Sequence, residues 1–134
     1  MIQEEQEAVQ KLKKYIQEGC SGGEPDKYEM EECLWQVLLL FQEVPFYTAK
    51  GLDFTYHIKG NEIFFSRKDK SITRATVMLG FYAALSMRQR GELVTGPKKL
   101  GCFGASYLYP VFIALGIIEK ADKKRDNLNI KKNQ

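Results

Sequence analysis

The spacing of apolar residues predicts two helices in the first third of the chain. Leu12 and Ile16 fall on one face of a helix over residues 3–18. A second helix over residues 26–44 is closed by Pro45, and its apolar side chains cover too much of its surface for a helix that faces water. We therefore expect the second helix to be central to the core.

Beyond residue 52 the apolar period changes from that of a helix to two, the period of a strand. Apolar side chains alternate with polar ones over residues 54–58, and a second apolar run follows at 63–65. Gly60 and Asn61 lie between the two runs, and Gly60 can take the positive φ that a two-residue type II′ turn requires at its first position. This pattern predicts a β-hairpin.

Three further helices are predicted in the rest of the chain. Ser71 or Thr73 can cap a long helix that runs to about Arg90. A short helix begins at Pro97, which suits the first helical position, and a last helical stretch covers residues 105–115. Together these elements predict an α+β protein that is mostly helical, with about five helices and one β-hairpin.

Two local signals add detail to these helices. Asp26 and Glu29 form the D-x-x-E pattern of a capping box, in which each side chain accepts a hydrogen bond from a free backbone N–H at the helix start. Gly80 lies in the middle of the third predicted helix, where glycine costs about 1 kcal/mol relative to alanine. We therefore expect another element to cross that helix closely at Gly80.

The length and composition are those of one globular domain. The chain has 134 residues, and its 44% hydrophobic and 28% charged fractions are close to globular averages, which excludes a disordered or membrane class. We expect one domain over residues 1–118, made of an acidic helical part (1–49) and a part with the hairpin and the C-terminal helices (50–118), followed by a flexible basic tail (119–134). The longest apolar runs are half the length that spans a bilayer, and the N-terminus is acidic where a secretory signal is basic. These features predict a cytoplasmic protein without membrane contact.

Charge is divided unevenly along the chain. Residues 1–49 hold four Lys or Arg against ten Asp or Glu, and residues 50–134 hold sixteen against seven, so the two parts carry −6 and +9. Many of the acidic residues stand at predicted helix starts, where the helix dipole favours them. The basic excess has no such explanation, and it indicates an anionic partner.

The order of elements over residues 71–118 resembles a helix-turn-helix or winged-helix unit. A long helix is followed by a short helix, a turn bounded by Gly101 and Gly104, and a last helix. In such units the start of the last helix enters the major groove of DNA, and basic residues of neighbouring turns hold phosphates. We therefore predict a nucleic-acid-binding protein, specifically a DNA-binding homodimer with a regulatory role. The candidate binding residues are Arg67, Lys68, Lys70, Arg74, Lys98, Lys99, Ser106 and Tyr107.

The last helix conflicts with this interpretation in two ways. If it begins at Gly104, Pro110 lies in its interior, where proline costs about 3 kcal/mol; if it begins near Tyr109, Pro110 is its first residue and is favourable. The helix is also too apolar to read bases, and its aromatic residues, with Phe103, are expected in the core or in subunit contacts. The alternative function is a non-enzymatic interaction module that self-associates through this helix, with the acidic helices of one subunit against the basic face of another.

Patterns that indicate catalysis or metal binding are weak. His57 is the only histidine and no partner is marked for it, while Asp53, Glu62 and Lys68 lack the spacing of a nuclease metal site. We expect no enzymatic activity, no cofactor and no metal. Reduced thiols are expected at the three widely spaced cysteines, Cys20, Cys33 and Cys102.

Overall fold

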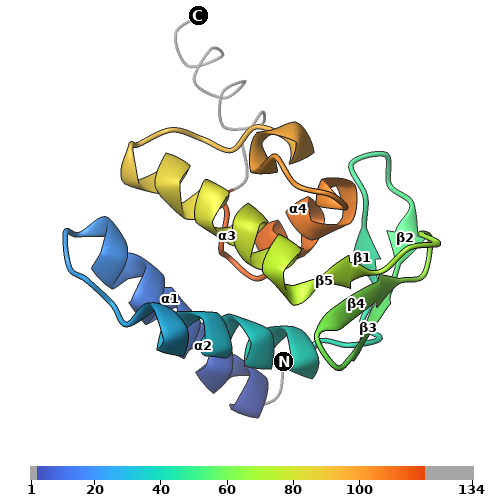
Figure 1. The fold of residues 1–134 in the computed structure, drawn as a ribbon, viewed down its shortest axis with the longest axis horizontal. Coiled ribbons are helices and arrows are strands. Elements are labelled where there is room, and N and C mark those ends of the chain that lie inside the picture. The colour runs from blue at the N-terminus through green and yellow to red at the C-terminus, as the bar shows by residue number, and fades with distance from the viewer. Residues whose placement is uncertain (1–2, 120–134) are drawn as a thin grey trace, which may run out of the picture.

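The computed structural model describes residues 3–119; most of the expected basic tail, from residue 120 onward, lies outside the described residues. Helices α1 (Gln3–Cys20) and α2 (Lys27–Leu40) form a helical hairpin that packs against α3 (Arg74–Gln89), with α4 (Ala105–Ala114) behind α3 and the strands at one end of the molecule (Figure 1). The chain is therefore a mostly helical α+β protein, as predicted.

The number of α-helices differs from the prediction. Residues 3–119 contain four α-helices, and the short helix expected after Pro97 is a single 3-10 turn, η1 (Pro97–Leu100). This turn contacts both α3 and α4 and connects them at the top of Figure 1.

Five short strands form two antiparallel sheets, one of two strands and one of three. Strands β3 (Tyr56–Lys59) and β4 (Glu62–Phe65) form the predicted hairpin around Gly60, whose φ of 61° suits the predicted turn. Strand β5 (Ile72–Thr73) pairs with the other edge of β4, and β1 (Phe46–Tyr47) pairs with β2 (Asp53–Phe54). The prediction of one hairpin is thus incomplete, because strands of two residues are too short to show a period.

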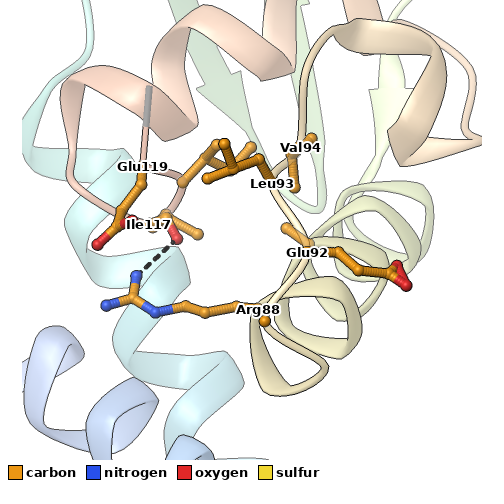
Figure 2. Close-up of a pocket in the computed structure, with 9 residues that line it drawn as sticks. Arg88, Glu92, Leu93, Val94, Ile117 and Glu119 are labelled. Carbon is orange, nitrogen blue, oxygen red and sulfur yellow. Dashed lines mark hydrogen bonds between the residues drawn. The ribbon is translucent and has the colours of Figure 1, made fainter. Parts of the chain in front are cut away.

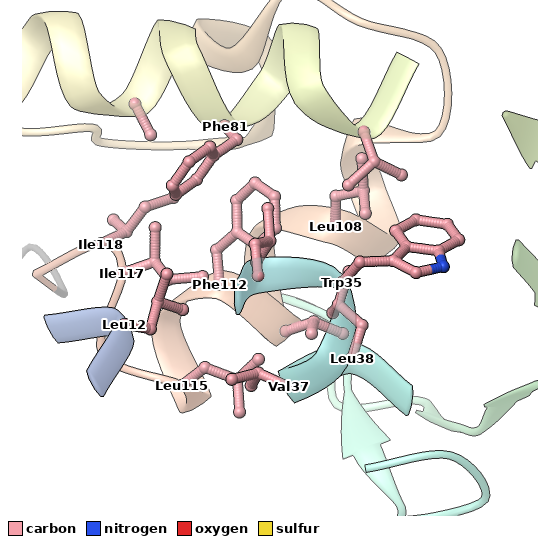
Figure 3. Packing of buried hydrophobic residues seen from close by; sticks show 14 of the residues in the cluster. Leu12, Trp35, Val37, Leu38, Phe81, Leu108, Phe112, Leu115, Ile117 and Ile118 are labelled. Carbon is pink, nitrogen blue, oxygen red and sulfur yellow. The ribbon is translucent and has the colours of Figure 1, made fainter. Parts of the chain in front are cut away.

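The core lies between the helical hairpin and the two C-terminal helices. Leu12 of α1, Leu38 of α2, Phe81 of α3 and Phe112 of α4 are fully buried and point into the same cluster (Figure 3). The rings of Phe81 and Phe112 meet edge to face, with their centroids 6.4 Å apart. Since α2 contributes buried side chains along its whole length, the prediction that it is central is confirmed.

Helix α2 begins where the sequence predicts and ends earlier. The Asp26 carboxylate accepts a hydrogen bond from the Glu29 N–H at 2.9 Å, which confirms the first half of the capping box. The helix ends at Leu40, and not beside Pro45, because Glu43 adopts a left-handed φ of 64° and donates its N–H to the Tyr56 carbonyl. The helix end is therefore set by a strand contact and not by the proline.

Helices α3 and α4 confirm two local predictions and resolve one alternative. The Thr73 hydroxyl caps α3 by accepting from the Thr76 N–H at 3.2 Å. A Cβ on Gly80 would lie 2.9 Å from the Cys102 sulfur, so another element does cross α3 closely there. Helix α4 starts directly after Gly104, which places Pro110 in its interior, and the Ser106 carbonyl consequently cannot receive the helical hydrogen bond from residue 110.

No helix within residues 3–119 is both long and apolar enough to cross a bilayer. Cys20, Cys33 and Cys102 are all free thiols, as predicted.

Candidate nucleic-acid interface

Both arginines predicted to hold phosphates are engaged by carboxylates of their own chain. Arg74 lies 2.5 Å from the Glu32 carboxylate and 5.0 Å from the ring of Trp35, so it ties the start of α3 to α2. Arg67 pairs with the Asp53 carboxylate at 3.0 Å and also donates to the Asp53 carbonyl. These two side chains hold elements together and contribute little free positive charge.

Tyr107 is positioned by packing and does not extend from the start of α4. Its ring stacks on Phe65 with centroids 5.3 Å apart and meets Phe54 edge to face at 5.1 Å. Its hydroxyl donates to the Arg67 carbonyl at 3.2 Å. Tyr107 therefore anchors α4 on the strands, which places the first turn of α4 beside the loop that carries Arg67 and Lys68.

Three other predicted residues gather around an aromatic side chain. Lys68 places its ammonium 3.6 Å from the centre of the Phe103 ring, and Phe103 is 54% exposed. Lys98 and Ser106, both exposed, line an open hollow of about 500 Å³ together with Phe103. We call this set, Lys68, Lys98, Phe103 and Ser106, the Phe103 surface.

Two glycines present Phe103 at the tip of its turn. Gly101 and Gly104 have φ values of 60° and 77°, in the left-handed region that favours glycine. A Cβ on Gly104 would lie 1.8 Å from the Ile72 side chain and 3.8 Å from the Lys68 side chain. The absence of a side chain at Gly104 therefore lets β5 and the preceding loop approach the turn and brings Lys68 over Phe103.

Phe103 does not lie in the core, which is one of the two places predicted for it; the other, a subunit contact, stays a prediction. An aromatic residue is buried in most contexts, which is why the prediction for Phe103 was the core or a subunit contact. The signal that could have marked Phe103 as a candidate interface residue is its place between two glycines in a turn that also follows a basic pair, Lys98 and Lys99.

The first turn of α4 borders the Phe103 surface and has no capping side chain. The N-cap position is Gly104, which has no side chain to accept a hydrogen bond from the free N–H groups. The first-turn N–H groups and the helix dipole make this end of α4 favourable for an anion.

The remaining predicted cations, Lys70 and Lys99, are exposed and do not line the hollow beside Phe103. The pKa of Glu92 is lowered, chiefly by a hydrogen bond from Arg90 and also by the charges of Arg90 and Lys99. Lys70 is exposed in the loop between β4 and β5 and makes no ion pair within residues 3–119. Of the net +9 in residues 50–134, +4 belongs to residues 120–134, outside the described part.

The candidate catalytic residues are not brought together. His57 lies on the outer side of the hairpin, where its ring stacks on Phe64 at 5.0 Å. Glu62 and Lys68 stand at and beyond opposite ends of β4, and Asp53 is held by Arg67. Within residues 3–119 no three His, Cys, Asp or Glu side chains are grouped to hold a metal ion.

At two other hollows, a polar side chain of the lining is hydrogen-bonded to a backbone carbonyl of the same chain. In a small hollow of about 210 Å³ at the end of α3, Arg88 donates to the Ile117 carbonyl at 3.2 Å, while Glu92 points away from the guanidinium (Figure 2). A larger cleft of about 600 Å³ lies between the α1–α2 turn and α3, where Gln89 donates to the Gly19 carbonyl. Both sets of hydrogen bonds connect distant segments of the same chain.

Most of the large apolar residues of α4 lie within the core of the chain itself. Leu108, Val111, Phe112 and, directly after the helix, Leu115 are each at most 4% exposed. The self-association predicted through the last helix therefore has little apolar surface available on that helix. The large apolar side chains exposed in residues 3–119 are Tyr28, Tyr47, Leu52, Leu79, Leu93 and Phe103.

No family model, curated protein or solved structure matches this chain. Its class, a mostly helical α+β protein with small antiparallel ladders, is defined by the structure alone. What the chain can bind must therefore be inferred from its own side chains, and the Phe103 surface combines an exposed aromatic residue with an exposed lysine, Lys98, and a half-buried one, Lys68.

Proposed function

We propose that this protein binds nucleic acid through the Phe103 surface. The observation that carries the proposal is the Lys68 ammonium 3.6 Å from the ring centroid of Phe103, a residue that is 54% exposed. Many proteins that bind single strands stack bases on exposed aromatic rings and hold the adjoining phosphates with neighbouring basic residues. Lys98 and Ser106 supply a second cation and a hydroxyl in the hollow that Phe103 also lines.

The order α3, η1, α4 supports comparison with a helix-turn-helix unit. The proposed ligand contacts differ from those of such a unit, because few of them come from the last helix. Two of the three hydroxyls of α4 are already donated to backbone carbonyls, from Tyr107 to Arg67 and from Tyr109 to Val94. Ser106 is the remaining hydroxyl. The proposed contact therefore comes mainly from the turn before α4 and from Lys68, and a winged-helix homodimer would present two such surfaces.

The affinity for nucleic acid should fall as the salt concentration rises, because lysines that neutralise phosphates release counterions. Each phosphate neutralised by a lysine contributes a slope of about −0.7 (single strand) to −0.9 (duplex) to the plot of log K against log salt concentration. Because Arg67 and Arg74 are held by carboxylates, they should contribute less to this slope than Lys68 and Lys98.

Fluorescence anisotropy with labelled single-stranded and duplex DNA, over a salt series, tests the proposal on the full chain. Lys68→Ala and Lys98→Ala should each reduce the magnitude of the slope by about 0.7–0.9. Lys14→Ala is the matched control, since Lys14 is an exposed lysine on α1. Absence of binding to either DNA at low salt, or unchanged slopes in both lysine variants, would rule the proposal out.

A further inference from the structure

We infer that the Phe103 surface takes an unpaired base, so that the ligand is single-stranded nucleic acid and not an intact duplex. The inference rests on the proposed function and names its substrate. It starts from the Phe103 ring, which remains exposed although neighbouring aromatic side chains such as Tyr107 are packed against the strands.

The ring is held in place on one side and open on another. The Lys68 ammonium lies 3.6 Å from the ring centroid, where the negative face of the ring attracts it. Phe103 also borders the hollow lined by Lys98 and Ser106. A flat ring that enters this hollow can stack on Phe103 while its phosphates meet the two lysines, which is the arrangement of a single-strand site.

A duplex fits the same residues poorly. Bases in a duplex are stacked on one another, so their faces are not available to Phe103, and their edges are read by polar side chains that enter a groove. Helix α4 offers only the Ser106 hydroxyl for this purpose, because the Tyr107 and Tyr109 hydroxyls are donated to backbone carbonyls. The charge of Lys68 and Lys98 can hold duplex phosphates, but it gives no base contact.

The test compares oligothymidine with a duplex of the same length by fluorescence anisotropy. The wild-type chain should bind oligothymidine more tightly. Phe103→Ala should weaken that binding by about 5- to 150-fold, the range for loss of one stacked base, and should leave duplex binding almost unchanged. The salt slope of Phe103→Ala should equal that of the wild type, since phenylalanine neutralises no phosphate.

Two variants control for the aromatic character and for exposure. Phe103→Trp should retain the preference for the single strand, because its ring also stacks. Tyr28→Ala removes an aromatic side chain that is 71% exposed on α2, and it should have no effect.

The outcomes separate this inference from the proposed function. Equal binding of both DNAs, or no effect of Phe103→Ala on oligothymidine, would overturn the single-strand inference and leave nucleic-acid binding in place. Failure to bind either DNA at low salt would overturn the proposed function itself.

Discussion

Replacing Gly80 with alanine should change the stability of this protein in opposite directions, depending on the side chain at position 102. An added Cβ would lie 2.9 Å from the Cys102 sulfur, closer than a normal contact, and 3.8 Å from both Leu108 and Phe112, which is ordinary contact. Alanine gains about 1 kcal/mol over glycine inside a helix, whereas overpacking costs about 1–3 kcal/mol. Gly80→Ala should therefore lower the free energy of unfolding by up to about 2 kcal/mol.

Removing the sulfur should reverse the sign. In a Cys102→Ala background the nearest remaining atoms are those 3.8 Å away, so only the gain in helix propensity, about 1 kcal/mol, is left. Gly80→Ala should then stabilise the protein. The difference between the two backgrounds, about 1–3 kcal/mol, is the interaction energy between the two positions.

Urea unfolding followed by circular dichroism, on the wild type, the two single variants and the double variant, measures all four corners of this cycle. An equal effect of Gly80→Ala in both backgrounds would show that Cys102 does not limit the approach to α3. A stabilised Gly80→Ala single variant would refute the reasoning as well, because the contact would then have no cost.

Three other variants test the caps, contacts and buried groups. Tyr56→Phe removes a buried hydroxyl that donates to the Leu38 carbonyl at 2.6 Å and should cost about 1 kcal/mol near neutral pH. Burial raises the pKa of Tyr56, so above about pH 10 the folded state keeps the phenol proton while the unfolded state loses it. The free energy of unfolding should therefore fall by up to about 1.4 kcal/mol per pH unit in the wild type and less steeply in Tyr56→Phe. Equal slopes against pH for the two proteins in urea unfolding would contradict this. Gly104→Ala combines a left-handed φ with a clash against Ile72 and should lower stability by about 2–5 kcal/mol; a thermal midpoint equal to the wild type would exclude that clash. Arg74→Met removes the ion pair with Glu32 and should lower the free energy of unfolding by about 1 kcal/mol without changing DNA affinity. A loss of affinity in anisotropy would show that Arg74 contacts the nucleic acid.

Features that depend on neighbours in sequence were predicted well. The hairpin around Gly60 and the Thr73 cap each involve residues within a few positions of one another. The close approach at Gly80 was also predicted, because a glycine in a helix interior implies a packing reason even when the partner is unknown.

Features that depend on distant partners were missed or misplaced. The end of α2 is fixed by the Glu43 N–H and the Tyr56 carbonyl, a contact that no pattern before Pro45 indicates. Strands β1, β2 and β5 have two residues each, so each exists only through its pairing with another segment. Sequence periodicity cannot detect such strands.

The candidate site was predicted in part for the same reason. Lys68 lies over the Phe103 ring, and Lys98 and Ser106 line the hollow beside Phe103, but the sequence does not show that Phe103 is the residue these three share. It also does not show that Arg67 and Arg74 are paired, since their partners lie 14 and 42 positions away. A basic residue in a sequence is therefore available to a ligand only if no carboxylate of the fold reaches it first.

The glutamates of α2 are likewise engaged by side chains of the same chain. Glu29 accepts a hydrogen bond from the Tyr15 hydroxyl, Glu31 from the Tyr82 hydroxyl and Glu32 from Arg74. These three carboxylates connect α2 to α1 and α3, so their charge stabilises contacts inside one chain and does not require the basic face of a second subunit. A net charge of −6 against +9 thus says little about function until each pair is assigned, and after assignment Lys68 and Lys98 remain beside the one exposed phenylalanine in residues 3–119.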